Sequence, residues 1–136
     1  MSLPAGAQSD DVIPAVTRLI SFDLMKVFSG FPEQNCVHTN REFAIEKGLP
    51  DAVTQGMQTY AYLLEMLVTH FGNDWHASGR VAVSFIKMVL PGDTVTARGT
   101  VIGREPLADR TRLRLEVWVE NQHQVKVIAG EASVLI

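Results

Sequence analysis

An apolar segment in the middle of the chain, TQGMQTYAYLLEMLVT at residues 54–69, has Glu65 as its one charged side chain. Its apolar residues recur at the i, i+3, i+4, i+7 spacing of a helix. They are Met57, Tyr60, Ala61, Leu64, Leu67 and Val68, with Leu63 and Met66 widening the stripe. A helix that is apolar on most sides is stable when other elements cover it. The segment therefore predicts a buried central helix that the rest of the chain has to enclose.

After residue 79 the hydrophobic period changes to two, which is the period of a strand. The segment 110–121 alternates most clearly, since Leu113, Leu115, Val117 and Val119 fall on one face and mostly charged side chains on the other. Further strands are expected at 80–90, 94–105 and 124–136, with turns at PGDT (91–94) and PLAD (106–109). These segments predict four antiparallel strands.

The first half of the chain contains shorter elements. A strand is expected at 12–20 and a helix at 22–28, capped by Ser21. A second short helix is expected within 39–48, capped by Thr39 or Asn40 and ended by Gly48, and 70–79 is expected to be the loop that leaves the central helix. Residues 1–11 are expected to be a flexible N-terminal segment before a single domain at 12–136. The fold class is α+β, with a curved antiparallel sheet wrapped around one central helix.

Composition limits the classes of function. Hydrophobic residues make up 46% and charged residues 20% of the chain, which is typical of a packed domain. The net charge is −3 and the cations are scattered, which argues against a nucleic-acid surface. No stretch approaches the ~20 apolar residues of a membrane span. The single cysteine, Cys36, and an N-terminus without a secretory signal pattern favour a cytoplasmic location.

Polar side chains crowd the segment EQNCVH at 33–38, which is either a solvated loop or the floor of a site. Glu33 and His38, five residues apart in an irregular segment, can converge on one water molecule. A carboxylate and an imidazole are side chains that enzymes use to move protons. Asn35 either orients this loop or forms an Asx-type turn. Cys36 is expected to be a small buried side chain rather than a nucleophile.

Several segments resemble those of the MaoC-like dehydratases, a hot-dog-fold family that includes the (R)-specific enoyl-CoA hydratases. The family has Ser-Gly, then Asp-x-Asn-Pro-(Ile/Leu/Val)-His and a short helix, where this chain has FSG, EQNCVH and TNREFAIEKGLP (28–30, 33–38, 39–50). The family's His-Gly-Met and Lys-Pro-Val-x-Pro-Gly-Asp-Thr correspond to QGM (55–57) and KMVLPGDT (87–94). The resemblance covers residues 12–136 and implies a single hot-dog fold.

This chain departs from the family pattern at four places. Phe31 and Pro32 are inserted after Ser-Gly, and Glu33 stands where the family has aspartate. Cys36 replaces the proline, and Gln55 replaces the histidine of His-Gly-Met. Asn35 and His38 keep the family's spacing. The resemblance therefore implies the fold more strongly than it implies one activity.

The resemblance also implies roles for individual residues. Glu33 and His38 correspond to the catalytic pair that activates water and moves protons, and the N–H of Gly56 corresponds to the group that stabilises the enolate oxygen. The alternative for Gly56 is close packing of the helix on the sheet. Substrate-binding positions are Asn35, Gln55, Met57 and Lys87. Lys87 is one of several cations that could meet a CoA phosphate; the others are Arg80, Arg98, Arg104 and Arg110.

The function that the resemblance implies is reversible hydration or dehydration of a 2-enoyl thioester on CoA or an acyl carrier. No metal and no redox cofactor is expected. One alternative is a hot-dog acyl-CoA thioesterase, and another is an inactive acyl-CoA-binding or partner subunit. A homodimer or a larger even-numbered oligomer is expected, with the segment 110–121 offering an unpaired strand edge.

Overall fold

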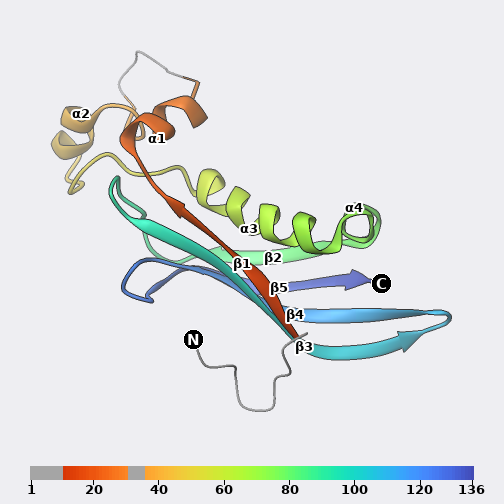
Figure 1. The fold of residues 1–136 in the computed structure, drawn as a ribbon. Helices are drawn as coiled ribbons and strands as arrows, with labels where there is room; N and C mark the ends of the chain where they lie inside the picture. The colour runs from red at the N-terminus through yellow and green to blue at the C-terminus, as the bar shows by residue number, and fades with distance from the viewer. Residues whose placement is uncertain (1–10, 31–35) are drawn as a thin grey trace.

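Strands and helices follow the order that the hydrophobic pattern predicts, with one additional helix (Figure 1). The computed structural model describes residues 11–30 and 36–136. Its elements are β1 (Val12–Leu19), α1 (Phe22–Phe28), α2 (Arg41–Glu46), α3 (Gly56–Phe71), α4 (Asn73–Ser78), β2 (Arg80–Phe85), β3 (Thr94–Leu107), β4 (Arg110–Glu120) and β5 (Lys126–Leu135). The predicted α+β class is confirmed.

The strands form one antiparallel sheet in the order β1-β3-β4-β5-β2. β4 lies in the middle and pairs with β3 on one side and β5 on the other. The prediction that the segment 110–121 has an unpaired edge is therefore wrong, because both of its edges are occupied. The outer strands are β1 and β2, so edge-to-edge pairing with another chain would use one of these.

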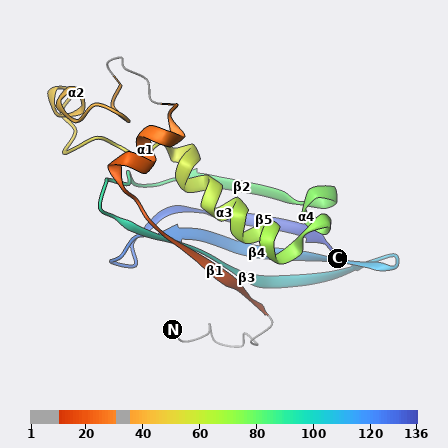
Figure 2. The same cartoon turned by 45° about the horizontal axis from the view of Figure 1, so that its top comes forward.

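α3 lies along one face of the sheet, which twists and curves beneath it (Figures 1 and 2). The buried residues of the helix are Gln58, Thr59, Leu63, Met66 and Leu67. This face is rotated from the predicted stripe, since Met57 and Ala61 are exposed. The sheet covers only one side of the helix, and a stripe that is apolar on most sides does not specify which side that is. The central helix is confirmed, but its buried face was predicted only in part.

Residues 70–79 do not form the expected loop, because α3 continues to Phe71 and α4 follows directly. Gly72 separates the two helices with a φ of +57°, and its N–H donates to the carbonyl of Val68 at 2.8 Å. Trp75 anchors α4, being only 8% exposed within the core cluster. The backbone N–H of Leu135 on β5 donates to the Ser78 hydroxyl at 2.9 Å. Burial of Trp75 in the core thus stabilises a helix that the polar composition of residues 70–79 does not predict.

Two predicted strands have different ends in the structure. β2 ends at Phe85, and the N–H groups of Ile86 and Lys87 both donate to the carbonyl of Val127 instead of continuing the ladder. β3 continues through Pro106 to Leu107, where a turn had been expected. β1 pairs with β3 only as far as Thr100, so the last part of β3 has no β1 neighbour. A proline is tolerated in such a segment because its missing N–H breaks no ladder bond.

The short helices begin where their capping residues predict. The hydroxyl of Ser21 accepts from the N–H of Leu24 at 3.0 Å, which caps α1. The side chain of Asn40 accepts from the N–H of Phe43 at 3.0 Å, so Asn40 rather than Thr39 caps α2. Gly48 follows α2 with a φ of +86°, a conformation that glycine adopts without strain.

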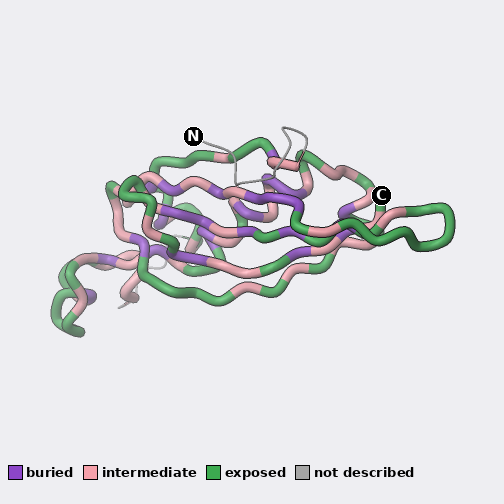
Figure 3. Tube along the Cα trace, turned by 90° about the horizontal axis from the view of Figure 1, so that it is seen from below, coloured by how far each residue is buried: buried purple, intermediate pink, exposed green. Residues whose placement is uncertain are grey.

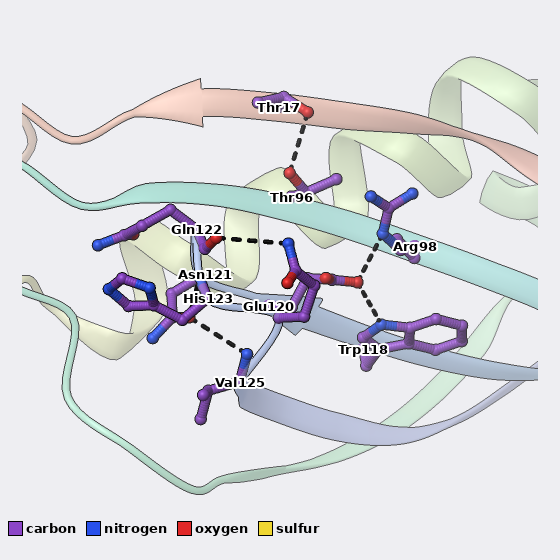
Figure 4. Close-up of polar contacts among 10 residues, drawn as sticks. Thr17, Thr96, Arg98, Trp118, Glu120, Asn121, Gln122, His123 and Val125 are labelled. Carbon is purple, nitrogen blue, oxygen red and sulfur yellow. Dashed lines mark hydrogen bonds and ion pairs between the residues drawn. The ribbon is translucent and has the colours of Figure 1, made fainter. Parts of the chain in front are cut away.

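Burial alternates along much of the strands, and the purple segments of Figure 3 mark the buried residues. Leu113, Leu115, Val117 and Val119 are all at most 5% exposed, which confirms the predicted inner face of β4. Glu120 is the exception on the polar face, at 7% exposed. Its Oε1 accepts from Arg98 Nε at 2.6 Å and from Trp118 Nε1 at 3.0 Å (Figure 4). These two donors compensate the buried charge.

Gly130 on β5 lies opposite Val83 on β2, where the two backbones approach closely. A Cβ at residue 130 would lie 2.0 Å from the carbonyl oxygen of Ala82 and 2.7 Å from the Cα of Val83. Because backbone would have to move, Gly130→Ala is expected to lower the free energy of unfolding by roughly 3 kcal/mol, as overpacked cores do. Urea unfolding followed by circular dichroism measures this change.

Gly103→Ala on β3 is the matched control for that substitution. The nearest atom to a Cβ at residue 103 is the Cβ of Arg114 at 3.8 Å, an ordinary contact. The control is expected to change the free energy of unfolding by less than about 1 kcal/mol. Equal unfolding midpoints for the two variants would contradict the close pairing of β2 with β5.

Candidate active site

His38 lies in the turn that precedes α2, and it is held to the segment that leads into α3. Its Nδ1 is 2.6 Å from the carbonyl oxygen of Val53. A carbonyl oxygen only accepts, so Nδ1 carries the hydrogen and donates it. The N–H of Val53 donates in turn to the carbonyl of Val37 at 2.9 Å, which fixes the turn against this segment. In the neutral imidazole, Nε2 is then the nitrogen that is able to accept a proton.

The N-terminus of α3 adjoins the same turn. No side chain among the described residues caps this helix at its N-cap residue, Gln55. The amide Nε2 of Gln55 instead donates to the hydroxyl of Ser29 at 2.7 Å. The first N–H groups of a helix have no carbonyl behind them, so those at Gly56 and Met57 are available to a ligand oxygen. The partial positive charge at this end would stabilise an oxygen that gains negative charge.

Gly56 also packs closely on β2, as the alternative interpretation of this residue required. A Cβ at residue 56 would lie 3.0 Å from Cε1 of Phe85. Glycine therefore lets the first turn of α3 lie directly on an aromatic ring of the sheet. This packing and a free N–H at the same residue are compatible, because the N–H and the Cβ direction point to different places.

A cavity of about 340 Å³ lies between His38, the first turn of α3 and the chain that leaves β2. Its polar lining consists of His38, Thr54, Thr59 and Lys87, and Gly56 contributes backbone. The other lining residues are apolar: Val53, Phe85, Ile86, Met88, Val89, Val127 and Ile128. A volume of this size is in the range of small-molecule sites. The arrangement suits an apolar group with one polarised oxygen, held beside an imidazole.

The structure brings three of the sequence-predicted site residues to this cavity: His38, Gly56 and Lys87. Gln55 and Met57 do not line it. The side chain of Gln55 bonds to Ser29, and Met57 is 57% exposed. Glu33 and Asn35 lie outside the described residues.

Sequence reasoning missed Thr54 and Thr59, which are 4% and 2% exposed and line the cavity. Thr59 did carry a signal, since it is a threonine three residues after Gly56 in a mostly apolar helix. Phe85 and Ile128 carried none, because they reach the site only through the pairing of β2 with β5.

The five cations considered for phosphate binding have different surroundings. Arg98 is paired with Glu120, and Arg104 and Arg110 are paired with Asp11 and Asp74 at 2.5 and 2.9 Å. Lys87 lies on the cavity, whereas Arg80 lies on two other hollows of about 470 and 450 Å³. These hollows are larger, but neither is lined by a histidine or by the start of α3. We therefore assign the candidate site to the 340 Å³ cavity.

Within residues 11–30 and 36–136, no three histidine, cysteine, aspartate or glutamate side chains gather as a metal site would require. None of the helices in these ranges is long and apolar enough to cross a membrane. Cys36 is a free thiol and is partly rather than fully buried.

Comparison with known families matches residues 32–135 of this chain to the model of the MaoC like domain. Among curated proteins, the uncharacterized protein YdeM of Bacillus subtilis (strain 168) is 29% identical over 118 residues, which are 84% of this chain and 83% of YdeM. The matched family segment includes His38, Gly56 and Lys87.

Solved structures show the same fold. The (R)-hydratase from A. caviae involved in PHA biosynthesis superposes with a TM-score of 0.73 at 21% identity, covering 94% of this chain and 98% of the hydratase. The C-terminally truncated HadBC (3R-hydroxyacyl-ACP dehydratase) complex from Mycobacterium tuberculosis gives a TM-score of 0.65 at 13% identity, covering 89% and 90%. The fold is therefore the hot-dog fold that the sequence predicts.

Proposed function

Because this chain belongs to the MaoC-like domain family, we propose that it catalyses the reversible hydration of a 2-enoyl thioester to a 3-hydroxyacyl thioester. The observation that carries the proposal is that the imidazole of His38 and the N-terminus of α3 share one mostly apolar cavity. An apolar chamber with a proton acceptor and an oxyanion-stabilising end is what this addition requires.

In the proposed reaction, the oxygen of a water molecule attacks the β-carbon while a side chain removes one of its protons. A second proton is delivered to the α-carbon, so the product gains one hydroxyl and one hydrogen across the former double bond. Glu33 and His38 divide these two transfers between them. The Nδ1–H of His38 is already donated to Val53, so Nε2 is the nitrogen that exchanges the proton.

The N–H of Gly56 stabilises the thioester oxygen while the α-carbon carries the developing enolate charge. The apolar walls formed by Phe85, Val127 and Ile128 hold the acyl chain. Lys87, exposed at the rim, attracts a phosphate of the thioester carrier, and Asn35 orients the segment that bears the catalytic pair. The carrier is CoA or an acyl carrier protein.

A second copy of the chain is proposed to pair along the edge of β2. Apolar residues gather beside this edge and are half exposed: Met57, Phe85, Ile86 and Met88, at 50–57%. Covering them would close the outer side of the cavity, which Phe85, Ile86 and Met88 line. Sedimentation is expected to give at least twice the chain mass of 15.0 kDa. A monomer at micromolar concentration would contradict this assembly.

Two other functions would use the same fold. A hot-dog thioesterase would also use a carboxylate and a helix N-terminus, but would direct water at the carbonyl carbon. An inactive acyl-CoA-binding or partner subunit fits the substitutions at Glu33 and Gln55, and the HadBC neighbour is itself a complex. Location in the cytoplasm and a place in acyl-CoA or fatty acid metabolism are part of the leading proposal.

One assay separates these functions. Crotonyl-CoA is mixed with the protein, and the enoyl absorbance and the release of free thiol are followed together. The proposed function predicts loss of enoyl absorbance without thiol release. Thiol release would favour the thioesterase, and binding without any change would favour the inactive subunit.

A further inference from the structure

Two threonine hydroxyls in the candidate active site are buried without a hydrogen-bond partner. Thr54 and Thr59 are 4% and 2% exposed, and both line the 340 Å³ cavity. Neither Oγ1 has a partner within the part of the chain that the structure describes. The side chains around them, such as Phe85, Val89 and Ile128, are apolar and offer none. Each hydroxyl is able both to donate and to accept.

Buried hydroxyls without partners make the ligand-free state of the site less stable. A buried polar group without a partner costs roughly a factor of five to a hundred in equilibrium terms. A threonine inside a helix can avoid this cost by bonding to the carbonyl four residues earlier. Thr59 does not do so, although the carbonyl of Gln55 accepts from the N–H groups of Gln58 and Thr59 at 3.0 and 3.4 Å. The hydroxyl of Thr59 is thus left for a ligand.

The position of Thr59 indicates which part of a substrate it meets. Thr59 lies three residues beyond Gly56, roughly 4.5 Å further along the helix axis. For an acyl chain that runs along α3, three carbon–carbon bonds of about 1.5 Å each in an extended zigzag span a similar distance, about 4 Å, from the thioester carbonyl carbon to C4. An alkyl group at C4 would seal both hydroxyls from water without bonding to them. A polar group there would pair them.

We propose that the site is specific for acyl thioesters that carry a carbonyl or hydroxyl group at or next to C4, which Thr54 and Thr59 recognise. The inference rests on the proposed function for the choice of a thioester and for the place of its carbonyl. To the proposed function, the inference adds the chemical class of the acyl chain, which the catalytic pair does not determine. Discrimination follows because a site built to hydrogen-bond a substrate group rejects the analogue that lacks it.

Calorimetric binding of pentanoyl-CoA and 4-oxopentanoyl-CoA tests the proposal. These ligands differ by one carbonyl group. Neither has a carbon–carbon double bond to hydrate, so binding is measured apart from catalysis. The parent protein is expected to bind 4-oxopentanoyl-CoA about tenfold more tightly, the effect of one hydrogen bond to a buried group. Thr59→Val and Thr54→Val remove one hydroxyl each at nearly constant shape, and each is expected to reduce this ratio.

Thr39→Val is the matched control. The hydroxyl of Thr39 is also buried and unpartnered, but Thr39 does not line the cavity. Removing any of the three hydroxyls is expected to raise the thermal midpoint of the ligand-free protein, whereas only the variants at residues 54 and 59 should lose the preference. Equal affinities for the two ligands in the parent, or a preference that survives both cavity variants, would overturn the inference.

Hydration of crotonyl-CoA, measured on the same preparations, separates this inference from the proposed function. Hydration without a preference for the oxo ligand overturns the specificity and leaves the reaction standing. A preference for the oxo ligand without hydration of either crotonyl-CoA or its C4-hydroxylated analogue, 4-hydroxybut-2-enoyl-CoA, overturns the reaction and leaves the recognition of a polar acyl chain standing.

Discussion

Replacing His38 with asparagine is expected to lower kcat for hydration of crotonyl-CoA by roughly 10²–10⁴-fold, the usual contribution of a general acid–base group. The amide nitrogen of asparagine can occupy the place of Nδ1 and donate to the carbonyl of Val53, as the histidine does at 2.6 Å. The substitution therefore removes Nε2 while the anchor of the turn is retained. Initial rates of enoyl absorbance loss measure the effect.

His38→Ala is the companion variant, because it removes Nε2 and the bond to Val53 together. It is expected to be as inactive as His38→Asn but less stable by about 1 kcal/mol, the net worth of one hydrogen bond. An asparagine variant that hydrates crotonyl-CoA within twofold of the parent would show that Nε2 moves no proton. Equal stability of the two variants would show that the bond to Val53 does not stabilise the fold.

Glu33→Gln is expected to lower kcat by roughly 10²-fold or more, because glutamine keeps the size of the side chain but cannot accept a proton. Glu33 lies outside the described residues, so this prediction rests on its place in the EQNCVH segment and on the family resemblance. The same kinetic assay applies, with Glu46→Gln, an exposed residue of α2, as the control of equal charge change.

Combining Glu33→Gln with His38→Asn tests whether the two groups act on one water. Groups that act as a unit are strongly non-additive, so the double variant is expected to be little slower than the slower single variant. Rate losses that multiply would mean that the two residues act independently. A Glu33→Gln protein as fast as the parent would remove Glu33 from the mechanism.

Local signals in the sequence predicted the elements well where one residue decides the structure. Ser21 and Asn40 cap their helices through single side-chain bonds to nearby N–H groups. The alternation of Leu113 to Val119 identified the inner face of β4 because strand geometry leaves only two faces to choose from. α4 was missed because its anchor, Trp75, acts only through the core that other segments provide.

The candidate site was predictable to the extent that it follows a motif. His38 and Gly56 were identified from segment order, and Lys87 was one of several candidate cations; the structure places all three on one cavity. The sequence did not predict Thr59 and Phe85 as site residues. Their places at the cavity depend on how α3 is rotated on the sheet and on the register of β2 with β5. Both are tertiary properties, and the broad apolar stripe of α3 left its rotation open.

Hydration of crotonyl-CoA in water enriched with ¹⁸O, followed by mass spectrometry of the product, tests the central claim most directly. If the imidazole and the helix N-terminus direct water to the β-carbon, the label appears on C3 of a 3-hydroxybutyryl thioester that remains attached to CoA. Label in the carboxylate of a released acid, or no incorporation above the protein-free rate, would contradict the account.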